Sequence, residues 1–145
     1  MRLKIECEVE QDVRSVENGF TEDLFLALNP PFPKVKLLRF DGCKTDDVVS
    51  IELNFIFFKQ TWEALITEDE SNATTFRFVD VGTSLPFFLT DWRHHHLIVA
   101  DGEGAKIVDD ITFKTPWWLP EPLMFPAMYF QFLFRKPIYR KYFSK

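Results

Sequence analysis

The first ten residues alternate between apolar and polar side chains. Leu3, Ile5, Cys7 and Val9 fall on one side of an extended chain, and charged residues fall on the other. Because side chains alternate between the two faces of a strand, this period of two predicts a strand over residues 1–10 with one face buried.

The next stretch, residues 13–28, has helical spacing instead. The spacing is interrupted near Gly19, and Thr21 is placed to cap a second short helix. The prolines of Asn29–Pro33 end that helix, since proline cannot donate the backbone hydrogen bond that a helix interior needs. The pattern therefore predicts two short helices directly after the first strand.

Six further segments carry strand patterns, and the last five of them follow one another as an antiparallel meander. They cover residues 34–40, 48–57, 59–67, 75–81, 91–100 and 105–115. A final helix is predicted from Pro120 to Phe143, with kinks at Pro126 and Pro137. This order predicts a single α+β domain over residues 1–145, in which a sheet packs against a long C-terminal helix.

Aromatic residues make up 17% of the chain, with 17 phenylalanines. That many rings exceed what a tight core of this size needs, and a cavity lined by rings would use the excess. The net charge of −5 argues against a nucleic-acid partner, because phosphate binding depends on Lys and Arg. Basic residues gather in 135–145, which suits a helix C-terminus; contact with an anionic lipid surface is the alternative and is not predicted.

Neither Cys7 nor Cys43 indicates a disulfide framework, and no N-terminal segment has a basic head followed by an apolar run. The most apolar stretch, Leu119–Phe134, contains Glu121 and three prolines and is too short to span a bilayer. A cytoplasmic location is therefore expected.

A series of short motifs runs through the chain in a specific order. In sequence they are Phe40-Asp41-Gly42, Gln60-x-Trp62, Phe76-x-Phe78-x-Asp80, Pro86-Phe87-Phe88, Trp92-x-His94-x-His96 and Asp109-x-Ile111-x-Phe113. With the order of elements, they resemble the SRPBCC superfamily of START domains, pollen-allergen-like proteins and polyketide cyclases, and look like its cyclase- or dehydrase-related ligand-binding branch. The resemblance covers nearly the whole chain. It implies the helix-grip fold, a curved antiparallel sheet of about seven strands wrapped on the C-terminal helix around an internal cavity.

The register of the last hairpin places polar side chains on the inner face. If Ala100 faces Ala105 across the loop, His96 faces Asp109. By the same count, the remaining pairs on that face are Trp92 with Phe113, His94 with Ile111, and Ile98 with Ile107. The apolar partners make this face the interior one.

Five polar groups are therefore expected to share the cavity: Gln60, Asp80, His94, His96 and Asp109. A buried carboxylate needs a partner, and a His–Asp pair supplies one that can also orient an imidazole for proton transfer. Three roles stay open, namely a structural network, ligand anchoring, and catalysis by His96 with Asp109 or by His94. Because His95 points to the opposite face, the run of three histidines is weak evidence for a metal, and neither a metal nor a cofactor is predicted.

The sequence favours binding or carriage of an apolar small molecule, such as a lipid, a quinone or a polyketide-like aromatic. It carries no Gly-rich phosphate loop and no nucleophile elbow. The alternatives are a cyclase or dehydratase for a polyketide-like substrate and a ligand-regulated interaction module, as a monomer or a homodimer; enzymatic activity stays an open question, with carriage preferred. The expected ligand-binding residues are Phe55, Gln60, Trp62, Phe76, Phe78, Asp80, Trp92, His94, His96, Asp109, Ile111, Phe113 and Phe130.

Overall fold

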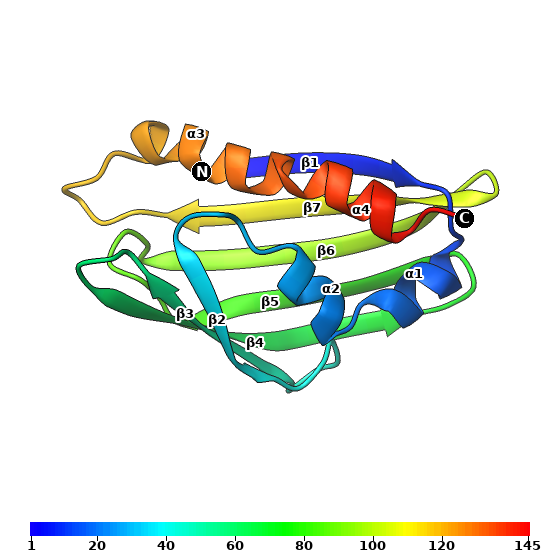
Figure 1. The fold of residues 1–145 in the computed structure, drawn as a ribbon, viewed down its shortest axis with the longest axis horizontal. Helices are drawn as coiled ribbons and strands as arrows, with labels where there is room; N and C mark the ends of the chain where they lie inside the picture. The colour runs from blue at the N-terminus through cyan, green and yellow to red at the C-terminus, as the bar shows by residue number, and fades with distance from the viewer.

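A computed structural model describes residues 1–145 and contains one antiparallel sheet of seven strands in the order β1-β7-β6-β5-β4-β3-β2 (Figure 1). The strands are β1 (Arg2–Val9), β2 (Lys34–Phe40), β3 (Val48–Asn54), β4 (Lys59–Ser71), β5 (Thr75–Ser84), β6 (Asp91–Asp101) and β7 (Gly104–Lys114). The helices are α1 (Val13–Gly19), α2 (Glu22–Ala27), α3 (Glu121–Leu133) and α4 (Arg135–Tyr142). This is the α+β helix-grip architecture that the sequence predicts.

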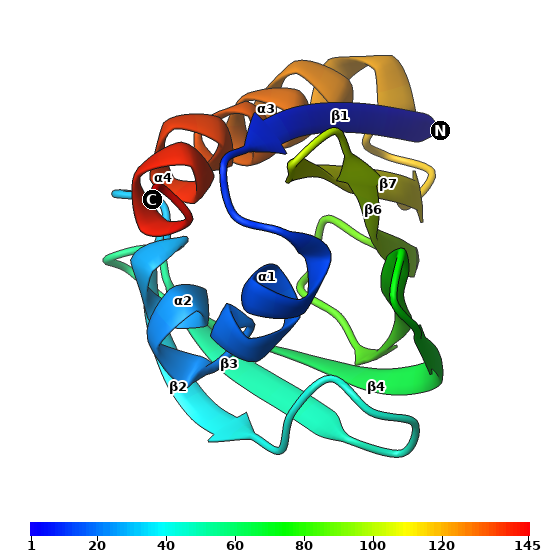
Figure 2. The ribbon, with the colours of Figure 1, turned by 90° about the vertical axis from the view of Figure 1, so that its right-hand side faces the viewer.

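The sheet curls from β1 round to β2, with all four helices on its concave side (Figure 2). Helices α3 and α4 pack along β1, and α1 packs on β5, β6 and β7. Strand β1 alternates between buried and exposed residues along its whole length, because one face meets the helices and the other meets solvent.

Strand β4 is longer than the apolar pattern predicts and continues to Ser71. Charged pairs replace apolar contacts over this extension. Arg77 of β5 forms ion pairs with Glu68 (2.8 Å) and Glu70 (3.2 Å) of β4. Opposite charges on neighbouring strands stabilise their pairing, so β4 continues beyond the residues that alternate between apolar and polar.

The predicted long C-terminal helix is divided at Phe134 into α3 and α4. The division follows from Pro137, which has no N–H to donate to the carbonyl of Leu133 one turn earlier. Pro126 lies inside α3 without ending it. None of the helices combines the length and hydropathy needed to cross a bilayer.

The buried apolar residues form two separate clusters. One, with 14 buried residues, packs α1, α2 and α4 against the end of the sheet that includes Val9 and Ala105. The other, with 8 buried residues, lies under α3 and includes Trp92 and Phe113. The interior therefore has two centres of packing rather than one continuous core.

Candidate ligand-binding site

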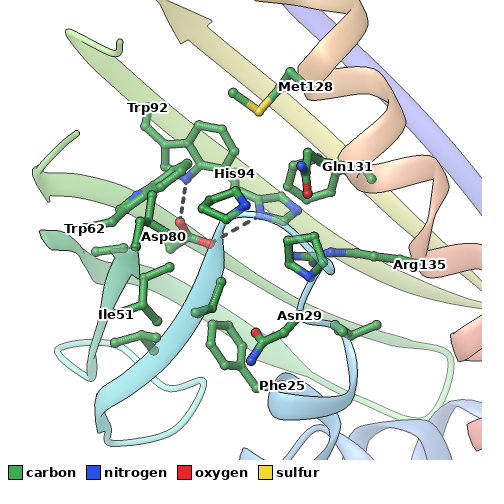
Figure 3. Close-up of a pocket in the computed structure, with 18 of the residues that line it drawn as sticks. Phe25, Asn29, Ile51, Trp62, Asp80, Trp92, His94, Met128, Gln131 and Arg135 are labelled. Carbon is green, nitrogen blue, oxygen red and sulfur yellow. Dashed lines mark hydrogen bonds and ion pairs between the residues drawn. The ribbon is translucent and has the colours of Figure 1, made fainter. Parts of the chain in front are cut away.

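A pocket of about 570 Å³ lies between the concave face of the sheet and the helices (Figure 3). Of the 36 residues that line it, 26 are hydrophobic. They come from opposite walls, with Phe25 on α2, Ile51 and Trp62 on the sheet, and Met128 on α3. The volume is within the range of pockets that enclose small molecules.

One part of the pocket lining is an aromatic rim, formed by Phe32, Phe55, Phe87 and Trp118. Phe87 stacks on Trp118 with ring centroids 6.0 Å apart, and both Phe32 and Phe87 meet Phe55 edge-on. Phe32, Phe87 and Trp118 are each about half exposed. Apolar rings therefore surround the approach to the pocket as well as its interior.

The polar end of the pocket is built by the β6–β7 hairpin and β5. The predicted register is confirmed, because Ala100 pairs with Ala105 and His96 pairs with Asp109. Asp101 also pairs with Gly104, so the turn contains only two residues, and Gly102 adopts a φ of +59° that favours glycine. A short turn of this kind fixes which side chains face inward along both strands.

Two imidazole rings and two carboxylates form the network at this end. Trp92 donates Nε1–H to Oδ1 of Asp80 (2.9 Å), and Nε2 of His96 binds Oδ2 of the same carboxylate (2.7 Å). Nε2 of His94 binds Oδ1 of Asp109 (2.8 Å). In each pair the imidazole N–H donates, because an ionised carboxylate only accepts.

The hydrogen bonds join residues that are diagonal neighbours on adjacent strands. His96 and Asp109 are therefore not hydrogen-bonded to each other, and the predicted His96–Asp109 pair is wrong in this respect. These residues are cross-strand partners, yet Nδ1 of His96 lies 3.9 Å from the Asp109 carboxylate. His96 instead stacks on its direct β5 neighbour Phe78 at 4.1 Å and directs Nε2 to Asp80. His94 stacks on His96 with ring centroids 3.5 Å apart and directs its own Nε2 to Asp109. Diagonal neighbours are within reach of long side chains, so register alone does not determine the pairing.

Burial and hydrogen bonding act in opposite directions on these groups. Burial raises the pKa of Asp80, but the His96 hydrogen bond and the nearby His94 outweigh it and lower the pKa below the usual value. The pKa of Asp109 is lowered in the same way, by His94 and Arg135 against burial. Burial, together with His94, lowers the pKa of His96 to about 4 despite the Asp80 carboxylate. At neutral pH the network therefore holds two carboxylates and an uncharged His96.

The ligand atoms of Asp80, His94 and His96 lie within 4.8 Å of one another, which is close enough to suggest a metal site. The distances within the trio argue for hydrogen bonding instead. Nε2 of His96 and Oδ2 of Asp80 are 2.7 Å apart, whereas two ligands on one tetrahedral zinc ion are separated by about 3.3 Å. The other Asp80 oxygen is occupied by Trp92.

Seven of the thirteen predicted ligand-binding residues line the pocket: Phe55, Trp62, Phe78, Asp80, Trp92, His94 and His96. The other six do not. Gln60 accepts a hydrogen bond from the Phe87 backbone (3.0 Å), and Phe76 packs against Phe20 in the core. Asp109, Ile111 and Phe113 are buried outside the lining, and Phe130 is 64% exposed.

Sequence reasoning missed the polar residues on the opposite wall. Gln131 and Arg135 project from α3 and α4 toward the pocket, and Asn29 lines it from the loop after α2, beside Phe25 (Figure 3). The signal that could have found them is their spacing, because Gln131, Arg135 and Tyr139 recur every four residues and share one helix face.

Several solved structures have a similar fold. The Zhui aromatase/cyclase from Streptomyces sp. R1128 has a TM-score of 0.70 at 12% identity, over 94% of this chain and 89% of that chain. A START superfamily protein from Mycobacterium smegmatis has a TM-score of 0.67 at 11% identity, over 95% of this chain and 96% of that chain. Major latex-like protein 151 from Panax ginseng has a TM-score of 0.61 at 14% identity, over 92% of this chain and 89% of that chain.

These similarities establish the fold alone, a curved antiparallel sheet packed against a C-terminal helix, which is the helix-grip fold that the sequence predicts. Neither a protein-family model nor a curated protein sequence matches the chain. One fold can host unrelated functions, so the function has to be argued from the pocket itself.

Proposed function

We propose that the protein binds or carries an apolar small molecule, such as a lipid, a quinone or a polyketide-like aromatic, in the pocket between sheet and helices. The supporting observation is the composition of the pocket, with 26 hydrophobic residues among 36 in a space of about 570 Å³. An apolar occupant would remove this surface from water, which is the main driving force for such binding. The fold it shares with a START superfamily protein and an aromatase/cyclase is consistent with this proposal.

Two measurements test the proposal. Organic extraction of the purified protein, followed by mass spectrometry, is expected to release a stoichiometric apolar compound. An environment-sensitive apolar dye is expected to bind saturably and to be displaced by long-chain lipids or polycyclic aromatics. If the wild-type protein shows neither a bound compound nor saturable dye binding, the proposal is wrong.

Neighbouring valines of β3 provide matched variants for the dye experiment. Val49 lines the pocket, whereas Val48 lies outside the lining, and both side chains are partly buried. Val49→Trp fills part of the pocket and should weaken dye binding about tenfold or more, by overpacking the site. Val48→Trp should leave the dissociation constant unchanged. Equal effects would show that the dye binds elsewhere.

The histidine network favours a second candidate function, cyclisation or dehydration of a polyketide-like substrate. His94 and His96 both line the pocket and both hold carboxylate partners. The carboxylate that orients His96 is Asp80 rather than Asp109. A general base works best with a pKa near the operating pH, and His96, with a pKa of about 4, is a weak base at neutral pH. Carriage is therefore the preferred proposal.

A polyketone substrate separates the two functions. Faster cyclisation or dehydration with the wild-type protein than with His96→Gln would assign the enzymatic role. Equal rates with the wild type, His96→Gln and His94→Gln, together with unimpaired binding of the substrate, would leave carriage as the function.

A further inference from the structure

Arg135 places a guanidinium group at the wall of an apolar pocket, with no carboxylate within hydrogen-bond distance. It lies at the start of α4, its side chain is 18% exposed, and it lines the pocket. It has five N–H donors and no acceptor. A charged donor group that leaves water without a partner carries a large cost, so its surroundings should supply acceptors.

The neighbouring protein groups leave most of these donors without an acceptor. The nearest carboxylate oxygen, Oδ1 of Asp109, is 3.9 Å from Nη1 and already binds His94 at 2.8 Å. The ring of Phe132 lies beneath the guanidinium at 4.3 Å, which stabilises its charge but takes up no N–H. The hydroxyl of Tyr139, one turn further along α4, is near enough for Arg135 to oppose the rise that burial causes in its pKa, but it makes no hydrogen bond of ordinary geometry and cannot accept from all five N–H groups.

Gln131, one turn earlier, does not fill the gap either. Its side-chain Nε2 donates to the backbone carbonyl of Phe32 (3.2 Å), which holds the amide toward the rim. Figure 3 shows Arg135 and Gln131 reaching into the pocket from the helix side, across from His94. The donors of Arg135 therefore face the space that a ligand would occupy.

We infer that Arg135 binds an uncharged acceptor oxygen of the ligand, such as the carbonyl of a ketone or a quinone. The inference rests on the proposed function and narrows its ligand class. A carbonyl oxygen gives the guanidinium the acceptor that it lacks. A carboxylate would do so as well, but it would add a negative charge beside Asp109, which is ionised. Asp109 already supplies the countercharge to Arg135, so a neutral oxygen is the better match.

Three probes with one ring skeleton test this inference: fluorene, fluorenone and fluorenecarboxylate. Fluorenone differs from fluorene by a carbonyl oxygen, so the ratio of their dissociation constants isolates the polar contact. In the wild-type protein fluorenone should bind about tenfold more tightly than fluorene, the gain expected of a hydrogen bond from a charged donor. Fluorenecarboxylate should bind more weakly than fluorenone. Displacement of the apolar dye gives all three constants.

Substitution at position 135 assigns the preference to this side chain. Arg135→Met keeps much of the side-chain volume. It should bind fluorenone and fluorene about equally well, while its dissociation constant for fluorene stays within about twofold of the wild-type value. Arg135→Lys retains a charged donor and should keep part of the preference. Arg140→Met removes an exposed arginine of the same helix and serves as the control, with the wild-type preference retained.

The outcomes distinguish this inference from the proposed function. If none of the probes binds the wild-type protein, the proposed apolar site is wrong. If fluorene and fluorenone bind equally well to the wild type, or if Arg135→Met retains the ketone preference, the carbonyl site is wrong and the apolar pocket stands. If fluorenecarboxylate binds most tightly and loses its advantage in Arg135→Met, Arg135 recognises a carboxylate and our inference is overturned.

Discussion

Lowering the pH from 7 to 5 should destabilise the protein by about 2 kcal/mol through one side chain, His96. The ring is stacked between Phe78 and His94 and donates Nε2–H to Asp80. Burial, with the nearby His94, lowers its pKa from 6.5 to about 4. The unfolded chain therefore takes up a proton at this position at a higher pH than the folded protein does.

The direction and size of the effect follow from this difference. The stabilisation from an uncharged His96 is complete above pH 6.5 and is lost as the pH falls toward the folded value of about 4. Over the whole window the loss is about 3 kcal/mol, of which about 2 kcal/mol falls between pH 7 and pH 5. Asp80 and Asp109 do not contribute in this range, because their pKa values lie below 3.8 and they stay ionised.

The assay is chemical denaturation at both pH values, with the wild-type protein and His96→Gln. The variant keeps an N–H donor for Asp80 but has no titrating ring, so its pH dependence should be smaller by about 2 kcal/mol. His95→Gln is the comparison variant, because His95 lies on the opposite face of β6 and the variant keeps the contribution of His96. Burial also lowers the pKa of His95, but less completely, so this variant should retain more of the wild-type pH dependence than His96→Gln does. The same pH dependence in wild type and His96→Gln would refute the reasoning. So would an NMR titration midpoint for His96 near 6.5.

The remaining predictions concern the carboxylate partner and the absence of a bound metal. Asp109→Ala should lower the free energy of unfolding by about 1–3 kcal/mol, because it leaves Nε2–H of His94 buried without its acceptor. Asp110→Ala removes a carboxylate that pairs with the exposed Arg2 and should cost about 1 kcal/mol or less, so equal losses in denaturation would contradict the argument. Dialysis against a chelator should leave the melting temperature unchanged, and a stoichiometric metal in elemental analysis would show this prediction to be wrong.

The sequence predicted the sheet well because its strands alternate strongly and its last turn is short. Apolar alternation located β1 and β2 closely, and the pairing of Ala100 with Ala105 fixed the register along β6 and β7. A one-residue slip would have turned Ile107 to the solvent, so the burial pattern admits only one register. The end of β4 could not be located in this way, because charged pairs rather than apolar contacts maintain it.

The details of the site depend on side-chain directions that periodicity does not encode. His96 and Asp109 are neighbours, but the choice between Asp109 and Asp80 was made by ring stacking on Phe78. Gln60 falls on the same face of β4 as Trp62, which predicts that it points inward. It lies near the start of β4, however, and its side-chain oxygen accepts a hydrogen bond from the backbone of Phe87 at the rim. Arg135 was missed because it was counted with the basic residues of 135–145 rather than placed on the helix face that it shares with Gln131 and Tyr139.

Residues of both clusters of buried apolar side chains line the pocket, so a bound ligand would contact both and add apolar contacts to the interior of the protein. A ligand that binds only the folded state stabilises it by about 2.7 kcal/mol at a hundredfold excess over its dissociation constant. That is a large part of the net stability of an ordinary domain, about 5–15 kcal/mol. Because cellular proteases remove unfolded chains, the proposed function implies that the abundance of this protein would rise and fall with the supply of a ligand that fills the pocket. Turnover of the unfolded chain would then couple the amount of protein to the amount of ligand.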